Sequence, residues 1–335
     1  MIAESRPGSR RWFGQGQLIQ FIPHLAAGMV LTVLPVFLPS YLQIVMTKFL
    51  IFALFAISFD LIFGYAGLLS LGHAAYFGAG GYAVAVLMLH YGLNSFWIGA
   101  PLGLLSAALI AALFGLIVLR VAGLYFLLLT FALGQLLYSV AWNWKWLNSP
   151  GMQGIAGLSQ PHLGFAIVSW NDLNFYYFVL LLFTLSYFVL RIITGSPFGH
   201  ALVGIRESES RMQALGYHTW LYKYLAFVIA GTFAGLAGIL FAYHNRMIAP
   251  GHFGVTTSFL PMAMAIIGGS GTLFGPVIGA AVLVFVEYFA SIITPERWPL
   301  ILGSIFVFSI MYMRGGIGVY LSRLGKKVCC LWGKR

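Results

Sequence analysis

Long apolar runs separated by short polar stretches make up most of this chain of 335 residues. Runs of about 20 apolar residues are long enough to cross the hydrocarbon core of a bilayer as α-helices. They predict spans at about residues 21–38, 44–63, 74–89, 96–119, 122–142, 175–190, 224–243, 255–267, 274–293 and 300–312. The run at 255–267 is short, so the count is ten only if this run crosses, within a range of eight to ten. The pattern predicts an all-α, polytopic transmembrane bundle of about ten helices.

Composition leads to the same class of protein. Hydrophobic residues make up 61% of the chain and charged residues 7%, and the mean hydropathy is +0.93. These values exclude a water-soluble globular protein. No polar linker is long enough to separate two cores, so one transmembrane domain is expected at 21–313. A short tail at 1–20 precedes it, and a basic tail at 314–335 follows.

The net charge of +11 is explained by membrane topology and does not require nucleic acid as a partner. With both termini in the cytoplasm, all but four of the 18 Lys and Arg residues lie on the cytoplasmic side, and the exceptions are Lys48, Lys145, Arg246 and Arg297. Such a bias is the expected positive-inside pattern, and it favours an even number of spans. The longest outside loop, 143–174, either covers the mouth of a pore, meets a soluble partner or simply connects two helices.

Glycine is concentrated in two clusters, at 64–82 and 268–280. Closely set glycines are expected to interrupt a helix at membrane depth. Gly271, Gly275 and Gly279 recur at a four-residue step, which also lets two helices approach closely, and this packing role is compatible with a role in a path. Non-helical backbone is tolerated in a bilayer only where it is buried in protein or lines an aqueous cavity. The clusters therefore supply candidates for a translocation path, namely Gly64, Gly67, Ser70, Gly72, Gly268, Gly269 and Gly271.

Two of the seven acidic residues, Asp60 and Glu287, fall inside predicted spans and are further path candidates. A carboxylate at a helix centre costs about 2.5–3.5 kcal/mol, so it is expected to face a partner or a wet cavity. Asp60 either reaches the headgroups, caps the break at Gly64 or lines the path. Glu287 is expected to accept hydrogen bonds from Ser or Tyr, or to contact the ammonium of a passing zwitterion.

A polar island between Arg206 and Arg211 carries four charged residues within the segment at about 198–218. A short amphipathic helix that is polar, basic and exposed to the cytoplasm is suited to docking another protein. Signatures of enzymes are missing. Gly325–Lys326 is followed by another Lys instead of Ser or Thr, so it is no phosphate loop, and no His pair has the helical spacing of a zinc site. We expect no catalytic residue, cofactor or metal, and we assign no role to Cys329 and Cys330.

The residues at 64–82, 201–238 and 268–280 resemble the permease subunits of bacterial ABC importers for branched-chain amino acids, of the LivM type. The similarity extends over about 42–318. It implies a heterodimer with a homologous second permease, two cytoplasmic ABC ATPases, a periplasmic substrate-binding protein and a place in the bacterial inner membrane. It also implies that the segment 201–216 is the coupling helix, with candidate contacts at Arg206, Glu207, Glu209, Ala214 and Gly216. Ser208 and Met212 depart from the family pattern, in which Asn and a small residue are usual.

Two alternatives stay open. One is the same kind of machine for urea, whose permeases share the central and final blocks. The other is a stand-alone transporter driven by an ion gradient. An ion relay needs chains of buried charges, and no Lys or His lies at helical spacing from Asp60 or Glu287, so this alternative is less favoured.

Overall fold

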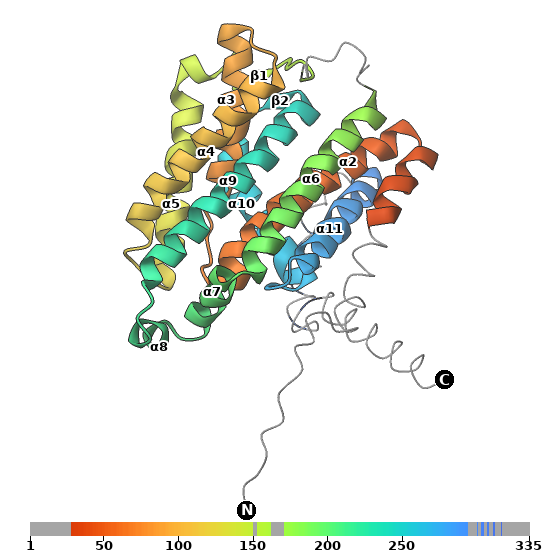
Figure 1. Ribbon diagram of the computed structural model, residues 1–335. Helices are drawn as coiled ribbons and strands as arrows, with labels where there is room; N and C mark the ends of the chain where they lie inside the picture. Colours follow the sequence, from red (N-terminus) through yellow and green to blue (C-terminus); the bar gives the residue numbers. More distant parts are fainter. Residues whose placement is uncertain are drawn as a thin grey trace, which may run out of the picture.

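The computed structural model describes residues 28–149, 153–161 and 171–293, together with 300, 303, 304, 307, 311 and 316 (Figure 1). The predicted tail at 1–20 and the pair Cys329–Cys330 lie outside this part. So do most residues of the predicted helix 300–312 and of the predicted tail 314–335.

The described residues are almost entirely helical, as the apolar runs predict. The main helices are α2 (Ser40–Asp60), α3 (Ala74–Tyr91), α4 (Phe96–Val118), α5 (Leu124–Asn143), α6 (Asp172–Gly195), α9 (Thr219–Asn245), α10 (Val255–Gly268) and α11 (Phe274–Ile293). Two short helices, α7 (Pro197–Glu207) and α8 (Glu209–Ala214), lie between α6 and α9. The remaining elements are the short turns η1 (Leu34–Phe37), η3 (Lys145–Leu147) and η4 (Pro250–Phe253), a π-helical turn η2 (Leu61–Tyr65), and strands β1 (Ile155–Ala156) and β2 (Met247–Ile248), which pair antiparallel.

Six helices of the described part are long and apolar enough to cross a membrane, so the predicted total of about ten is not confirmed. They are α2 with its π-helical continuation, α4, α5, α6, α9 and α11. The doubtful run at 255–267 is α10, whose 14 residues measure about 21 Å at 1.5 Å per residue, less than the hydrocarbon core. The helix α3 has 18 residues, or about 27 Å. Each of these two short helices borders a glycine-rich break.

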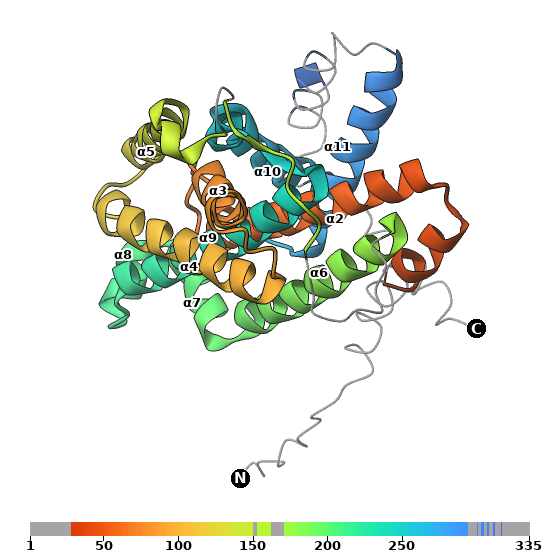
Figure 2. The same ribbon diagram turned by 90° about the horizontal axis from the view of Figure 1, so that it is seen from above.

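Helices α2 and α9 form the centre of the bundle. Within their apolar stretches, 83% and 67% of the residues are buried, against 22–28% for α4, α5 and α6. Seen from above, α5 and α6 lie on opposite sides of the bundle, with α3 and α9 between them (Figure 2). Helices α4, α5 and α6 therefore form the outer layer that is suited to contact lipid.

Small residues explain the close contact of α3 with α9. A Cβ added at Gly80 of α3 would collide with the backbone of Gly235, and one added at Gly238 of α9 would collide with the backbone of Phe77. Backbones that approach this closely are characteristic of small-residue interfaces between membrane helices. For Gly78–Gly81 the predicted interruption of the helix is therefore wrong, since these glycines stay helical inside α3 and allow its close packing against α9.

The close contact of α3 with α9 leads to a prediction about the stability of the protein. We expect Gly238→Ala to lower the free energy of unfolding by about 1–3 kcal/mol, because the added methyl group overpacks a closed interface. Thermal unfolding of the purified protein in detergent measures the effect. Gly195→Ala is the matched control, since nothing lies within 4 Å of a Cβ at Gly195. Equal melting temperatures of the two variants would contradict this account of the interface.

The bundle has two distinct ends (Figure 1). Helices α7 and α8 lie at one end, which we call the α7–α8 end, and the β1–β2 ribbon lies at the opposite end. Helix α2 runs from the β1–β2 end toward the α7–α8 end, and the first glycine-rich break follows directly after it.

Candidate functional site

The first predicted helix break is present and follows the end of α2. Helix α2 passes into the π-helical turn η2, and the chain then leaves helical geometry until α3 begins at Ala74. Gly67 has a φ of +72°, in the left-handed region that glycine adopts without steric cost. The Leu68 N–H donates to the Ile62 carbonyl at 2.8 Å, which closes the turn.

Hydroxyl groups from the break itself and from two neighbouring helices satisfy the backbone of this break. The buried Ser70 accepts a hydrogen bond from the Gly72 N–H at 3.3 Å. Thr130 of α5 accepts one from the Leu71 N–H at 3.2 Å, and Ser258 of α10 accepts one from the Ala74 N–H at 3.1 Å. Such partners are required where backbone leaves a helix inside a bilayer. Sequence analysis identified Ser70 and Gly72 but missed Thr130 and Ser258, because no spacing rule connects them to the break.

The second predicted break lies between α10 and α11. Helix α10 ends at Gly268, and Gly269 and Gly271 follow with φ values of +106° and +79°. A Cβ added at Gly268 would collide with the backbone of Gly275 on α11. The chain therefore needs glycine here both for its left-handed geometry and for the tight approach of two helices.

Asp60 connects the two breaks. Its side chain is fully buried, and Oδ1 accepts a hydrogen bond from the Gly271 N–H at 2.8 Å. Gly64 fits beside this bond, since an added Cβ would collide with the Asp60 carboxylate and the Gly271 nitrogen. The readings in which Asp60 reaches the headgroups or caps the break at Gly64 are wrong. The carboxylate is enclosed by protein, and it caps the second break instead.

Arg206, in the last turn of α7, also reaches the first break. Its Nη1 donates a short hydrogen bond to the Gly64 carbonyl, and its Nη2 pairs with Glu207 Oε1 at 2.8 Å. The stem of the side chain lies over Gly67, where an added Cβ would be 2.7 Å from Arg206 Cγ. We call Asp60, Gly64, Gly67, Arg206 and Gly271 the glycine junction. It brings together residues that the sequence analysis assigned to two separate functions, the translocation path and the coupling to ATPases.

The predicted coupling segment consists of two helices instead of one. Ser208, in extended conformation with a φ of −163°, separates α7 from α8, and Gly216 makes a left-handed turn before α9. Met212 of α8 packs against Gly204 of α7, where an added Cβ would be 2.8 Å from its sulfur. The Met212 side chain thus fills the space between the two helices at Gly204.

The other coupling candidates lie on the outside of this segment. Glu209 pairs with Lys223 at the start of α9, at 2.6 Å. Ala214 and Gly216 are exposed, and Leu215 between them is 72% exposed. The turn after α8 therefore presents small residues and one large apolar side chain at the α7–α8 end.

Glu287 lies away from the glycine junction. Its Oε1 accepts from Lys48 Nζ at 2.8 Å, in place of the expected Ser or Tyr partners. Helical spacing did not reveal this pair, because Lys48 and Glu287 belong to different helices, α2 and α11. Lys48 is the ninth residue of α2, and α11 packs along that helix. Lys48 precedes Asp60 by 12 residues, or about 18 Å along a helix, so the pair and the junction occupy different depths.

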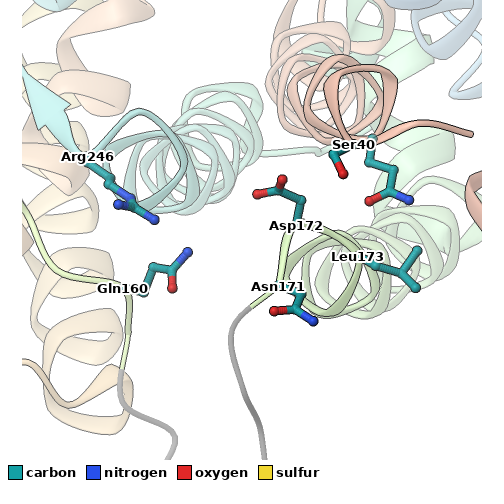
Figure 3. Close-up of a pocket in the computed structure, with 7 residues that line it drawn as sticks. Ser40, Gln160, Asn171, Asp172, Leu173 and Arg246 are labelled. Atoms are coloured by element: carbon teal, nitrogen blue, oxygen red, sulfur yellow. The ribbon is translucent and has the colours of Figure 1, made fainter.

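A polar recess opens at the β1–β2 end of the molecule (Figure 3). It has a volume of about 420 Å³ and is lined by Ser40, Gln43, Gln160, Asn171, Asp172, Leu173 and Arg246. Arg246 and Gln160 lie on one side, and Ser40, Asn171 and Asp172 lie on the other. Arg246 has a φ of 54°, which is unusual for a residue with a side chain. Sequence analysis singled out the loop at 143–174 but not this recess, which also needs α2 and the end of α9.

The described residues contain no group of three or more His, Cys, Asp or Glu placed to hold a metal ion. The features that they do contain are a backbone junction, a segment suited to docking, an intramembrane ion pair and a polar recess.

Comparison with known proteins identifies the family to which the chain belongs. Residues 41–313 match the family described as "Branched-chain amino acid transport system / permease component". The chain is 30% identical over 260 residues to the "High-affinity branched-chain amino acid transport system permease protein LivM" of Salmonella typhimurium, covering 71% of this chain and 61% of that protein. It is 25% identical over 276 residues to the probable LivM of Methanocaldococcus jannaschii, with 73% and 80% covered. The LivH permease protein of Salmonella typhimurium is 25% identical over 258 residues, with 72% and 82% covered.

The match thus spans about three fifths of the length of the enterobacterial LivM proteins. No solved structure shows significant similarity to the chain. The family match covers most of the described residues, including both glycine breaks and the coupling segment. The chain therefore belongs to the family of permease components of branched-chain amino acid transport systems.

Proposed function

We propose that this chain is a membrane-spanning permease subunit of an ATP-driven importer for leucine, isoleucine and valine. The observation that carries the proposal is the family match over 41–313, together with relatives that are named as branched-chain amino acid permease proteins. In this proposal a homologous second permease completes the translocation path, and two ABC ATPases supply the energy. A periplasmic binding protein delivers the substrate to the complex in the bacterial inner membrane.

The α7–α8 end faces the cytoplasm in this proposal. Arg120, between α4 and α5, and Arg191, near the end of α6, lie toward this end, as do Arg206, Arg211 and Lys223. Lys145 and Arg246 belong to the β1–β2 end. Cytoplasmic segments of membrane proteins carry an excess of Lys and Arg, which supports the orientation. In this proposal both termini also lie in the cytoplasm, in agreement with the positive-inside pattern of the sequence.

The ATPases dock on the exposed part of the coupling segment. Glu207 has a side chain that is 64% exposed, and the turn after α8 presents Leu215 at 72% exposure between Ala214 and Gly216. An apolar side chain surrounded by small residues and a peripheral charge is typical of a docking surface. The Glu209–Lys223 pair holds this surface against the start of α9.

The translocation path runs along the face of α2 and α11 and past the glycine junction. Lys48 and Glu287 have side chains that are 32% and 28% exposed in the single chain. A partly exposed charge pair within membrane-spanning helices is costly in lipid, so a second permease that covers this face would stabilise it. The enclosed pair then lines the outer part of the path, below the polar recess on which the binding protein docks.

Reconstitution tests the function directly. The permease, a homologous permease, the two ATPases and the binding protein are incorporated in liposomes, and uptake and ATP hydrolysis are measured. We expect leucine with binding protein to stimulate ATP hydrolysis and to accumulate in the lumen. Stimulation by urea instead of leucine would contradict the substrate. Accumulation of leucine by the permease without ATPases would contradict the ATP-driven mechanism.

A further inference from the structure

We propose that Arg206 is a latch between the coupling segment and the two glycine breaks, and that it acts on the membrane-embedded backbone instead of contacting an ATPase. The inference rests on the proposed function, because the latch transmits a movement that ATPases start. It replaces the expectation that Arg206 and Glu207 share one docking role.

The hydrogen bonds of the glycine junction connect three distant parts of the chain. The Arg206 guanidinium binds the Gly64 carbonyl, which is 142 residues away in the sequence. Asp60, one turn before Gly64, binds the Gly271 N–H, which is 211 residues away from it. A Cβ added at Gly271 would lie 3.3 Å from Arg206 Nη1, so the guanidinium lies against the second break as well. A movement of α7 therefore reaches both breaks through one side chain.

The charges of the junction couple the two breaks energetically. Asp60 is fully buried, its Oδ2 accepts no hydrogen bond within the described structure, and the Arg206 guanidinium lies beside Gly271, whose N–H donates to Asp60 Oδ1. A buried carboxylate is costly unless a positive charge or hydrogen bonds compensate it. Withdrawal of Arg206 would leave the Gly64 carbonyl unpaired and the Asp60 charge less compensated. Both breaks would then favour a new arrangement.

Gly67 is the residue against which the Arg206 side chain packs. The φ of +72° at this residue disfavours any side chain, and an added Cβ would lie 2.7 Å from Arg206 Cγ. The first break thus runs directly under the Arg206 stem. By contrast, Gly123 has a similar φ of +62° with nothing within 4 Å of an added Cβ. The close contact at Gly67 is therefore a property of this site and is not shared by every left-handed glycine in the chain.

The partners of Arg206 argue against direct docking. One terminal nitrogen binds Gly64 and the other binds Glu207, and the side chain is 36% exposed against 64% for Glu207. Glu207 holds the guanidinium from the outer side and keeps its own exposed face. Docking is consequently left to Glu207 and to the turn after α8.

Three variants of the full reconstituted complex test the latch, namely Arg206→Gln, Arg206→Lys and Gly67→Ala. We expect Arg206→Gln and Gly67→Ala to co-purify with the ATPases and to keep ATP hydrolysis within about twofold of the wild type. Leucine uptake should fall about tenfold or more, as the loss of a hydrogen bond to a charged group implies. Arg206→Lys keeps the charge and should retain intermediate uptake. Gly123→Ala is the matched control for backbone strain and should transport normally.

A second readout does not depend on leucine. Ser70, which is buried in the first break, is replaced by Cys after Cys329 and Cys330 have been replaced by Ser, and thiol labelling is followed with and without ATP. ATP should accelerate labelling in the otherwise wild-type protein but not in Arg206→Gln. Loss of the ATPases from Arg206→Gln, ATP-dependent labelling in that variant, or equal uptake by Gly67→Ala and Gly123→Ala would each overturn the latch. Failure of the wild type to take up leucine overturns the proposed function instead, and the labelling result still decides the latch.

Discussion

Lys48→Met should strongly reduce both the yield and the leucine uptake of the reconstituted permease. The substitution leaves Glu287 without the ammonium that now lies 2.8 Å from its carboxylate. An unpaired carboxylate near the centre of a membrane helix costs about 2.5–3.5 kcal/mol, which is a large share of a typical folding free energy. The double variant Lys48→Met/Glu287→Gln avoids this cost, because neither of the new side chains carries a charge. Thermal unfolding in detergent and uptake in liposomes measure the two effects separately.

The double variant also separates a structural role from a role in the path. A purely structural pair predicts that the neutral double variant recovers both stability and uptake. A pair that lines the path predicts recovered stability with reduced uptake, because the passing zwitterion loses two charged contacts. Lys145→Met is the control, since Lys145 lies in the short turn after α5, where solvent reaches it. A Lys48→Met variant as stable and active as Lys145→Met would show that the pair has no role.

Asp60→Leu should abolish the connection between the two glycine breaks. Leucine removes the acceptor of the Gly271 N–H, and a buried donor without a partner costs about 1–3 kcal/mol. We expect uptake to fall about 5- to 150-fold, as this cost implies, if the whole of it falls on the transport-competent state. Asp60→Asn is the matched variant, because its amide oxygen still accepts from Gly271 while the charge is lost.

The two substitutions at Asp60 distinguish hydrogen bonding from charge. Uptake by Asp60→Asn close to the wild-type value would assign the role to the hydrogen bond. An equal loss in both variants would assign it to the charge that faces Arg206. Normal uptake by Asp60→Leu would contradict any role for the junction. Initial rates of leucine uptake, normalised to the amount of folded complex, provide the comparison.

The apolar runs and the glycine clusters were sufficient to locate most of the fold. The runs at 96–119 and 274–293 differ by at most one residue from α4 and α11. The hydrophobicity of a membrane-spanning helix is a local property of the chain, so it can be recognised without knowing which other helices pack against it. The break at 66–73 was predictable for the same reason, since glycine lowers helix propensity. The glycines at 78–81 stay helical, because there the packing of α3 against α9 outweighs propensity. The number of crossings was less predictable, because the sequence does not show whether a run as short as α10, with 14 residues, crosses the membrane.

Site residues were recognised individually, but their partners were not. Asp60, Arg206 and Glu287 are conspicuous because charges are rare in so apolar a chain. Arg206 and Glu207 are neighbours in sequence, so a common role was the simplest reading. The structure separates them, because the side chain of Arg206 turns toward Gly64 while that of Glu207 stays 64% exposed.

The sequence by itself determined the class of the protein, the positions of six long apolar helices, two places where helices break and the resemblance to branched-chain amino acid permeases. Tertiary structure decided that Asp60 binds Gly271, that Arg206 binds Gly64 and that Lys48 pairs with Glu287. The partners in these contacts are 142 to 239 residues apart, and no helical spacing relates them. They meet because α2, α7 and α11 pack on a common bundle, and the cost of unpaired charge and backbone in that apolar interior selects the contacts that remain.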